Sequence, residues 1–165
     1  MENKPNRIIW HHTADISTGP QANKINRWHA KKGFTKSALG FYGGYHILIE
    51  KDGLVFRYRN DEEQGCHVAN QNKDTLGLGL AGNFSVELPT KEQEKSIHEV
   101  LTNWMSRWNI QESNILPHRA LAATECPGKL LANDWIVKLL YKKISNETID
   151  ILTDVIKYIQ SKFKT

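Results

Sequence analysis

The sequence of 165 residues predicts one α/β domain, because apolar runs suited to strands alternate with stretches suited to helices. Three observations carry this prediction. Residues 8–10 form a short apolar run, residues 45–59 have the pattern of a hairpin, and residues 90–108 repeat apolar side chains at helical spacing. A chain of this length can bury one hydrophobic core.

The composition, 39% hydrophobic and 24% charged, is that of a globular protein with a formal net charge of +4. A mildly basic protein favours anionic polymers such as cell wall, nucleic acid or a membrane surface. Lysines and arginines look scattered along the chain and no nucleic-acid-binding motif occurs, so no nucleic acid partner is expected. No apolar run reaches the roughly 18 residues of a membrane span, so membrane insertion is not expected.

Residues 1–6 lack the apolar segment of a signal peptide. We therefore expect the protein to be made in the cytoplasm and to act after release or through another export route. The two cysteines, Cys66 and Cys126, allow at most one bridge and do not indicate a disulfide framework. If Cys126 binds a metal, Cys66 is an ordinary, partly buried thiol.

The first predicted strand covers residues 7–12 and suits a central position in a sheet, covered on both faces. It ends in His11 and His12. Catalytic side chains often follow the ends of such strands. Because successive side chains of a strand point to opposite faces, only one of these histidines can point into a given site.

A helix is predicted from residue 20 to about residue 32. Pro20 suits the first helical position, and Gly33 is a plausible stop. Ile25 and Trp28 mark its predicted buried side.

Residues 45–50 and 54–59 are predicted strands joined by Asp52-Gly53, which is a strong hairpin signal. Residues 76–82 are a further apolar strand, in which alternating glycines permit the close approach of a neighbour or ligand. This segment is not a phosphate loop, because it lacks the Gly-Lys-Ser/Thr ending.

Thr90 and Gln93 form a predicted capping box for the helix over residues 90–108, whose apolar and aromatic stripe is interpreted as core. A last helix of the domain is predicted to open at Pro127-Gly128 and to run to about residue 140.

Residues 144–165 differ in character from the rest. Their apolar residues recur at alternating steps of three and four, the pattern of a coiled-coil seam, namely Ile149, Leu152, Ile156, Ile159 and Phe163. We predict a domain over residues 1–143 followed by an amphipathic helix over residues 144–165. This helix either packs back on the domain, docks on a partner, or mediates self-association through residues 146–163.

His118 and Cys126 are separated by seven residues and lie on one loop closed by Pro127-Gly128. Together with a histidine from the end of the first strand they are suitable ligands for a catalytic zinc ion with an open fourth position. Two alternatives stay open at this stage: Cys126 as a nucleophile activated by a histidine, or a pair without a chemical role. More than a hundred residues separate the two segments, so only folding can bring them together.

The motifs also occur in a characteristic order, which is Ile-Ile-Trp-His-His-Thr-Ala over residues 8–14, Trp28-His29, Gly-Tyr-His-Ile-Leu-Ile-x-x-Asp-Gly over residues 44–53, Leu-Gly-Leu-Gly-Leu-Ala-Gly-Asn over residues 76–83, and His-Arg…Thr-Glu-Cys-Pro-Gly over residues 118–128. This set resembles the zinc-dependent N-acetylmuramoyl-L-alanine amidases, which include phage lysozyme-type amidases and peptidoglycan recognition proteins. The resemblance covers roughly residues 7–140. It implies a mixed central β-sheet of about five or six strands flanked by helices.

The resemblance implies that His11, His118 and Cys126 bind Zn²⁺ and that Tyr45 is the catalytic tyrosine. The resemblance also implies a catalytic role for Thr124, which matches the threonine of the recognition-protein branch, where the phage branch commonly has lysine. The implied reaction is hydrolysis of the amide bond between N-acetylmuramic acid and L-alanine in peptidoglycan. This reaction lyses cell walls, as phage endolysins do, and it would make residues 1–143 a catalytic domain.

Three further residues are predicted substrate contacts. His67 and Asn83 fall near strand ends beside the inferred cleft, with loop hydrogen bonding as the alternative. Arg119 follows a predicted metal ligand, so it contacts either a stem-peptide carboxylate or the groups that support the ligand.

The main alternative function is a non-catalytic module that binds peptidoglycan. In members of this kind the zinc-binding cysteine is typically replaced, so the presence of Cys126 and Tyr45 favours catalysis. A third class, a regulatory protein that binds another macromolecule, stays open, because no residue of this sequence supports or excludes it.

Overall fold

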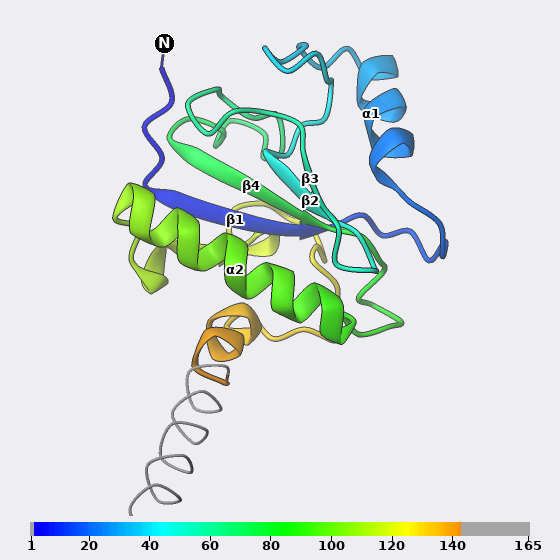
Figure 1. Cartoon of the computed structure of the whole chain (residues 1–165), viewed down its shortest axis with the longest axis vertical. Coiled ribbons are helices and arrows are strands. Elements are labelled where there is room, and N and C mark those ends of the chain that lie inside the picture. Colours follow the sequence, from blue (N-terminus) through cyan, green and yellow to red (C-terminus); the bar gives the residue numbers. More distant parts are fainter. Residues whose placement is uncertain (1, 143–165) are drawn as a thin grey trace, which may run out of the picture.

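The computed structural model describes residues 2–142, in which five strands form one mixed sheet in the order β3-β2-β4-β1-β5 (Figure 1). The strands are β1 (Arg7–His12), β2 (Ile47–Ile49), β3 (Val55–Arg57), β4 (Thr75–Leu80) and β5 (Ile115–Pro117). β1 pairs in parallel with β4 and β5, and β2 with β4, whereas β3 is antiparallel to β2. The predicted α/β fold with a mixed sheet is confirmed.

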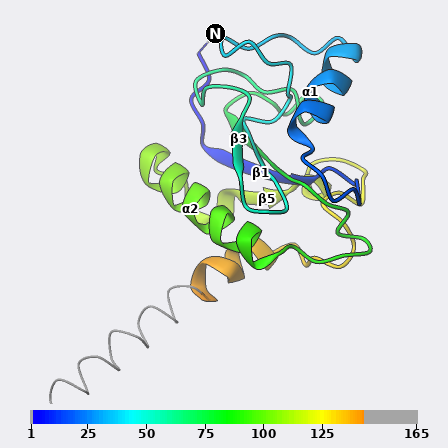
Figure 2. The same cartoon turned by 45° about the vertical axis from the view of Figure 1, so that its right-hand side comes forward.

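Helix α2 (Lys91–Trp108) and a helical segment that begins at residue 135 cover one face of the sheet (Figures 1 and 2). This face carries the main core, in which Ile8 and Trp10 of β1 pack with the leucines of β4 and with α2. The rings of Trp10 and Trp135 are 5.8 Å apart. Burying each large apolar side chain stabilises the fold by about 1.5–3 kcal/mol relative to exposure, so this face holds the fold together.

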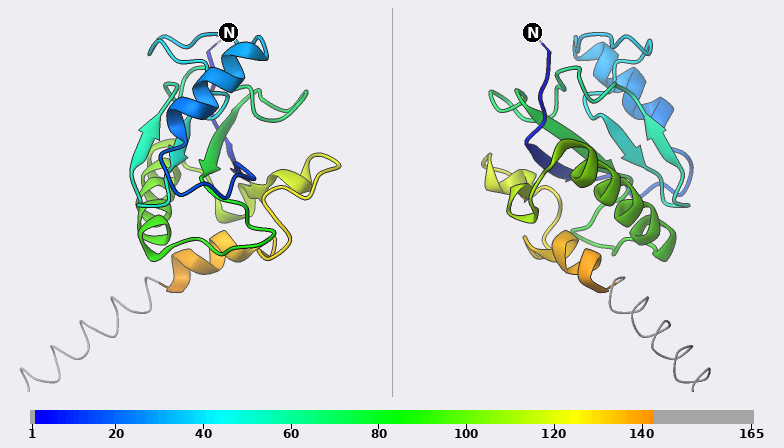
Figure 3. Two further views of the ribbon diagram at one scale, coloured as in Figure 1. Left: turned by 90° about the vertical axis from the view of Figure 1, so that its right-hand side faces the viewer. Right: turned by 60° about the vertical axis from the view of Figure 1, so that its left-hand side comes forward.

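Helix α1 (Ala22–Lys31) lies on the opposite face (Figure 3), where Ala22 and Ile25 pack with Leu48 and Tyr58. The predicted helix start at Pro20 is wrong, because the cap residue is Gln21.

The carboxylate of Glu50 caps this helix by accepting hydrogen bonds from the backbone N–H groups of Gln21 at 2.8 Å and Ala22 at 2.6 Å. A cap supplied by a strand end 28 residues away leaves no local signal in the sequence. The predicted burial of Trp28 is also wrong: its side chain is 50% exposed on the outer side of α1.

The predicted helix start at Pro127-Gly128 is seven residues too early, because residues 128–134 form turns and the helix begins at residue 135. Gly128 has φ +110°, and a Cβ atom there would lie 2.3 Å from the carbonyl carbon of Phe84. Leu130 N–H donates to the Phe84 carbonyl at 3.0 Å. The segment therefore docks on the loop after β4 before its helix begins.

Two single-turn 3₁₀ helices flank β5, which are η1 (Glu112–Asn114) and η2 (His118–Ala120). Within residues 2–142 no helix is long and apolar enough to span a membrane. The predictions made for residues 144–165, a coiled-coil seam and self-association, lie outside the described part of the chain.

Thr90 caps α2 as predicted: its hydroxyl oxygen accepts from Gln93 N–H at 3.0 Å, and the Gln93 side chain accepts from Thr90 N–H at 3.1 Å. The hydroxyl also donates to the Lys51 carbonyl at 2.7 Å. We expect Thr90→Ala to lower the free energy of unfolding by about 1 kcal/mol, because both bonds of the hydroxyl are lost.

Urea unfolding followed by circular dichroism measures this change. Thr102→Ala, on the exposed middle of α2, is the matched control and should be neutral or slightly stabilising. An equal loss in both variants would contradict a capping role for Thr90.

Candidate metal and catalytic site

The structure brings His11, His118 and Cys126 together: one ligand atom from each lies within 4.8 Å of the other two. His11 is in β1, His118 begins η2 directly after β5, and Cys126 lies in the loop that follows. Because β1 and β5 are parallel neighbours, their carboxyl ends meet at the same edge of the sheet. The predicted convergence of two distant segments is therefore present.

The donor set fits a zinc ion. His11 Nδ1 lies 3.8 Å from Cys126 Sγ, and the rings of His11 and His118 are 4.5 Å apart. Ligands at zinc distances of about 2.0–2.3 Å in a tetrahedron are separated by roughly 3.3–3.8 Å, so small side-chain rotations would bring the trio to one ion. Three protein ligands leave the fourth position open, as in catalytic zinc sites.

The two imidazoles are neutral. Burial lowers the pKa of His11 well below its usual value, and repulsion from His67, His118 and His12 lowers it further. Burial also lowers the pKa of His118. A neutral imidazole keeps one nitrogen lone pair, which is the form that binds a metal.

The thiol of Cys126 is protonated in the metal-free protein, because burial raises its pKa to about 11. A catalytic cysteine nucleophile needs a lowered pKa, since the thiolate is the reactive form. This environment argues against the nucleophile alternative. A bound metal ion would instead deprotonate the thiol on coordination.

His12 points away from this trio, as the alternation along β1 requires. Its Nδ1 accepts a hydrogen bond from Phe84 N–H at 3.1 Å on the core side of the sheet.

His67, a predicted substrate contact, lies behind His11 with both ring nitrogens engaged. Its Nδ1 is 3.1 Å from His11 Nε2, and its Nε2 is 3.2 Å from Thr75 Oγ1. Thr75 Oγ1 donates to the Asn72 carbonyl at 2.9 Å, so its oxygen accepts from His67 Nε2–H. His67 Nδ1 then accepts from His11 Nε2–H. This assignment leaves the lone pair of His11 on Nδ1, which faces Cys126.

The alternating glycines of β4 make room for the rings of this site. A Cβ atom at Gly77 would lie 2.6 Å from the His67 ring, and one at Gly79 would lie 2.7 Å from the Tyr45 ring. The leucines that alternate with these glycines, Leu76, Leu78 and Leu80, point into the core on the other face. The predicted close approach to this strand is confirmed, and the neighbours that approach are side chains of the site.

Tyr45 lies beside the trio, with its ring 5.2 Å from that of His11. Burial, with a contribution from Cys126, raises the pKa of its phenol well above the usual value. The hydroxyl group therefore stays protonated and can donate a hydrogen bond. The next residue, His46, faces away from the trio. Its Nδ1 accepts a hydrogen bond from Gly77 N–H at 2.9 Å, and its Nε2 donates to the Glu63 carbonyl at 2.8 Å.

The other predicted site residues are built into the surrounding loops. Thr124 is exposed, and its hydroxyl oxygen accepts from Cys126 N–H at 3.2 Å. Asn83 Oδ1 accepts from Ser85 N–H at 3.1 Å. Arg119 Nη2 donates to the carbonyls of residues 128 and 131 at 2.6 and 3.1 Å. Their predicted roles in catalysis or substrate binding stay predictions.

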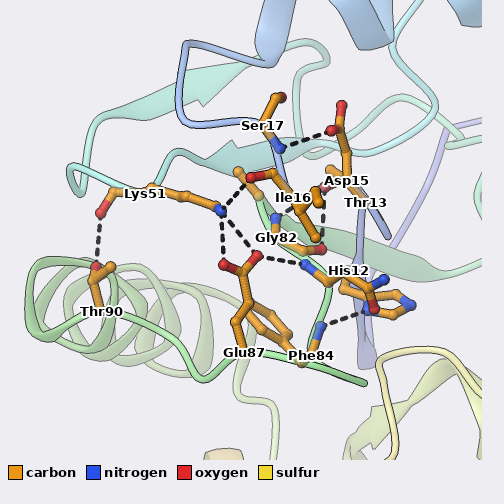
Figure 4. Close-up of polar contacts among 12 residues, drawn as sticks. His12, Thr13, Asp15, Ile16, Ser17, Lys51, Gly82, Phe84, Glu87 and Thr90 are labelled. Carbon is orange, nitrogen blue, oxygen red and sulfur yellow. Dashed lines mark hydrogen bonds and ion pairs between the residues drawn. The ribbon is translucent and has the colours of Figure 1, made fainter.

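Sequence reasoning missed Lys51 and Glu87, which join the loops around the site (Figure 4). Lys51 Nζ donates to the Ile16 carbonyl at 3.3 Å and lies 2.8 Å from Glu87 Oε1. Glu87 Oε1 also accepts from Asn83 N–H at 2.9 Å. The loops after β1, β2 and β4 are thereby tied together. No motif includes this ion pair, so no signal in the sequence could have found it.

A family model described as N-acetylmuramoyl-L-alanine amidase matches residues 1–129. Peptidoglycan-recognition protein SC2 of Drosophila melanogaster is 31% identical over 128 residues, which are 76% of this chain and 70% of that protein. Among solved structures, the N-acetylmuramoyl-L-alanine amidase LysC from Clostridium intestinale is similar with a TM-score of 0.69 and 31% identity, over 87% of both chains. The endolysin amidase LysCS from the same organism has a TM-score of 0.70 and 30% identity, over 87% of this chain and 85% of that one.

We expect Gly77→Ala to destabilise the fold by about 1–3 kcal/mol, because the new methyl group overlaps the His67 ring and forces it away from His11. Gly19→Ala is the matched control, since a Cβ atom there has nothing within 4 Å and should be neutral or stabilising. Thermal and urea unfolding of the metal-free proteins compares the two. Equal stability would show that His67 does not depend on the gap at Gly77.

Proposed function

This chain belongs to the N-acetylmuramoyl-L-alanine amidase family, and we propose that it is a zinc-dependent hydrolase of the amide bond between N-acetylmuramic acid and L-alanine in peptidoglycan. The observation that carries the proposal is the trio of His11, His118 and Cys126, whose ligand atoms lie within 4.8 Å of one another. We further propose a role in cell-wall lysis like that of endolysins, in line with the similarity to LysC and LysCS.

His11, His118 and Cys126 would hold the zinc ion, which would supply an activated water and polarise the substrate carbonyl. The chain contributes the remaining tasks. His67 holds His11 with the lone pair of Nδ1 directed at the ion site. The protonated phenol of Tyr45 donates a hydrogen bond to the oxygen on which negative charge develops. The Thr124 oxygen accepts from Cys126 N–H, so its own proton is free to donate.

A binding module without catalysis is the competing function, because the relatives include peptidoglycan-recognition proteins. A pure binding site has no need for a buried thiol beside two neutral imidazoles. The presence of Cys126 and Tyr45 beside His11 therefore favours catalysis.

We expect Tyr45→Phe to retain one zinc ion per chain but to lower turnover on purified cell walls by about 10²–10³-fold, because the ring remains and one donor is lost. Cys126→Ala and His118→Ala should lose metal and activity together. Tyr42→Phe is the control for removal of a phenol hydroxyl elsewhere.

Elemental analysis measures the zinc, and turbidity loss with mass spectrometry of the released muropeptides measures the reaction. Full activity of Tyr45→Phe would remove this residue from the mechanism. Stoichiometric zinc in either ligand variant would contradict the ligand set, and activity unaffected by a chelator would contradict zinc dependence.

Zinc affinity should rise with pH. Because burial raises the pKa of the Cys126 thiol to about 11, that proton must leave when the thiolate binds metal. The imidazole pKa values are lowered, so both histidines are already neutral near pH 7 and release no further proton. We therefore expect the zinc Kd to fall about tenfold per pH unit between about pH 7 and 8.

Competition with a chromogenic chelator measures this slope. A pH-independent Kd would show that the thiol is already ionised without metal. A change of about a hundredfold per pH unit would show that a histidine also loses a proton.

A further inference from the structure

The positive charge of this protein is concentrated in one segment, contrary to the scatter expected from the sequence. Residues 16–49 contain five lysines and arginines and no aspartate or glutamate. The rest of the chain holds the other 17 cationic residues and all 18 acidic residues, a net charge of −1. The net charge of +4 therefore arises from α1 and the loop that follows it.

The cations of α1 line an open hollow of about 380 Å³, formed by Thr13, Asp15, Lys24, Ile25, Arg27, Trp28 and Lys31. Helix α1 lies on the outside of the molecule (Figure 3, left), on the sheet face that carries the metal-binding trio. Thr13, which lines the hollow, follows His11 of the trio by two residues at the end of β1. A polymer that reaches the reaction site at the end of β1 can thus extend along α1.

Two cations of this hollow have no acidic partner among the described residues. Lys24 forms an ion pair with Asp15, but the side chains of Arg27 and Lys31 form no ion pair or hydrogen bond with any described residue. By contrast, Arg57 and Lys51 on other surfaces pair with Asp61 and Glu87. Unpaired cations of one sign create a positive potential that attracts anionic polymers.

The exposed Trp28 adds a flat apolar surface to this cationic face. Its side chain is 50% exposed, and Lys32 Nζ lies 4.3 Å from the centre of the ring. An aromatic ring can pack against the C–H face of a sugar or polyol while neighbouring ammonium groups bind phosphate.

On these grounds we propose that the α1 wall, defined as Lys24, Arg27, Trp28, Lys31 and Lys32, binds a phosphate-bearing anionic polymer attached to peptidoglycan. The inference extends the proposed function, because it places the anionic polymer of the wall beside the bond that the site cleaves.

The chemistry of the α1 wall favours a polymer over a single carboxylate. Lys24 and Lys31 are about 10 Å apart along the helix at 1.5 Å per residue, so the charges match a repeating anion. Three of the four cations are lysines, which act as mobile point charges rather than as a fixed fork for one carboxylate.

A membrane surface fits this helix poorly. A helix that lies in a membrane interface needs a broad apolar face. The apolar residues Ala22 and Ile25 of α1 are buried against the sheet, which leaves Trp28 as the large apolar side chain of this helix that is exposed.

The test compares two triple variants that each remove three positive charges. Arg27→Gln/Lys31→Gln/Lys32→Gln changes the α1 wall. Lys73→Gln/Lys91→Gln/Lys95→Gln, at exposed positions away from the hollow, is the matched control. Both are made in the full chain, and urea unfolding confirms that they fold. If the first triple variant does not fold, the single variants Arg27→Gln and Lys31→Gln serve the same comparison.

Binding is measured by co-sedimentation with purified cell walls, before and after acid extraction of their phosphate polymers, at low ionic strength and with chelator to prevent cleavage. We expect the α1-wall variant to bind unextracted walls about tenfold more weakly than the wild type, and the control within about twofold. On extracted walls the wild type and the α1-wall variant should bind equally. Added salt should weaken the binding of the wild type to unextracted walls more than that of the α1-wall variant.

Equal losses in the two variants, or equal wild-type binding to extracted walls, would overturn the proposal. The proposal would also be overturned if vesicles of anionic lipid bound the wild type and the α1-wall substitutions weakened that binding by the same factor. Hydrolysis of a small soluble muropeptide should be unchanged in the α1-wall variant. Absence of that hydrolysis in the wild type would instead contradict the proposed function while leaving the binding result intact.

Discussion

The parallel pairing of β1 with β4 on one side and β5 on the other is the constraint on which this site depends. It sets the end of β1 beside the end of β5, where His118 and Cys126 follow. It also sets His11 opposite Gly79, two residues along the strands from the pair of Ile9 and Gly77. The arrangement of the candidate metal-binding trio and of the rings that support it is thus a consequence of strand register, because a slip by one residue would turn His11 into the core and His12 into the site.

The two faces of the sheet have different tasks. The core face packs leucines of β4 against α2, so it stabilises the fold by burial of apolar side chains. The opposite face of the same strand has Thr75, Gly77 and Gly79, which accept the His67 and Tyr45 rings. A strand with large side chains on both faces would stabilise the sheet better but would exclude these rings. The glycines therefore lower strand stability in favour of the site.

Prediction from the sequence succeeded where the signal is local. The capping box of Thr90 and Gln93 lies within four residues, and the His118 loop keeps two candidate ligands on one short segment. It failed where a distant residue decides the outcome. Glu50 caps α1 across 28 residues, and Phe84 holds Gly128 and Leu130 in turns that delay the last helix. The His11–His67–Thr75 chain was invisible for the same reason, since its members are brought together only by the sheet.

The charge distribution shows a different limit of sequence reasoning. Lysines and arginines counted along the whole chain look scattered, because acidic residues accompany them everywhere except in residues 16–49. Residues 16–49 are positively charged because they contain no aspartate or glutamate, and a missing residue type does not appear as a sequence motif. Its consequence appears only when α1 is placed in space, on the same sheet face as the trio and with Arg27 and Lys31 left without acidic partners. The trio of His11, His118 and Cys126 is neutral without metal, so in the proposed function the long-range attraction of an anionic substrate comes from elsewhere on the surface. Under the two proposals, the charge that attracts the polymer lies on α1, apart from the groups that perform the reaction, and the trio stays uncharged until a metal ion binds.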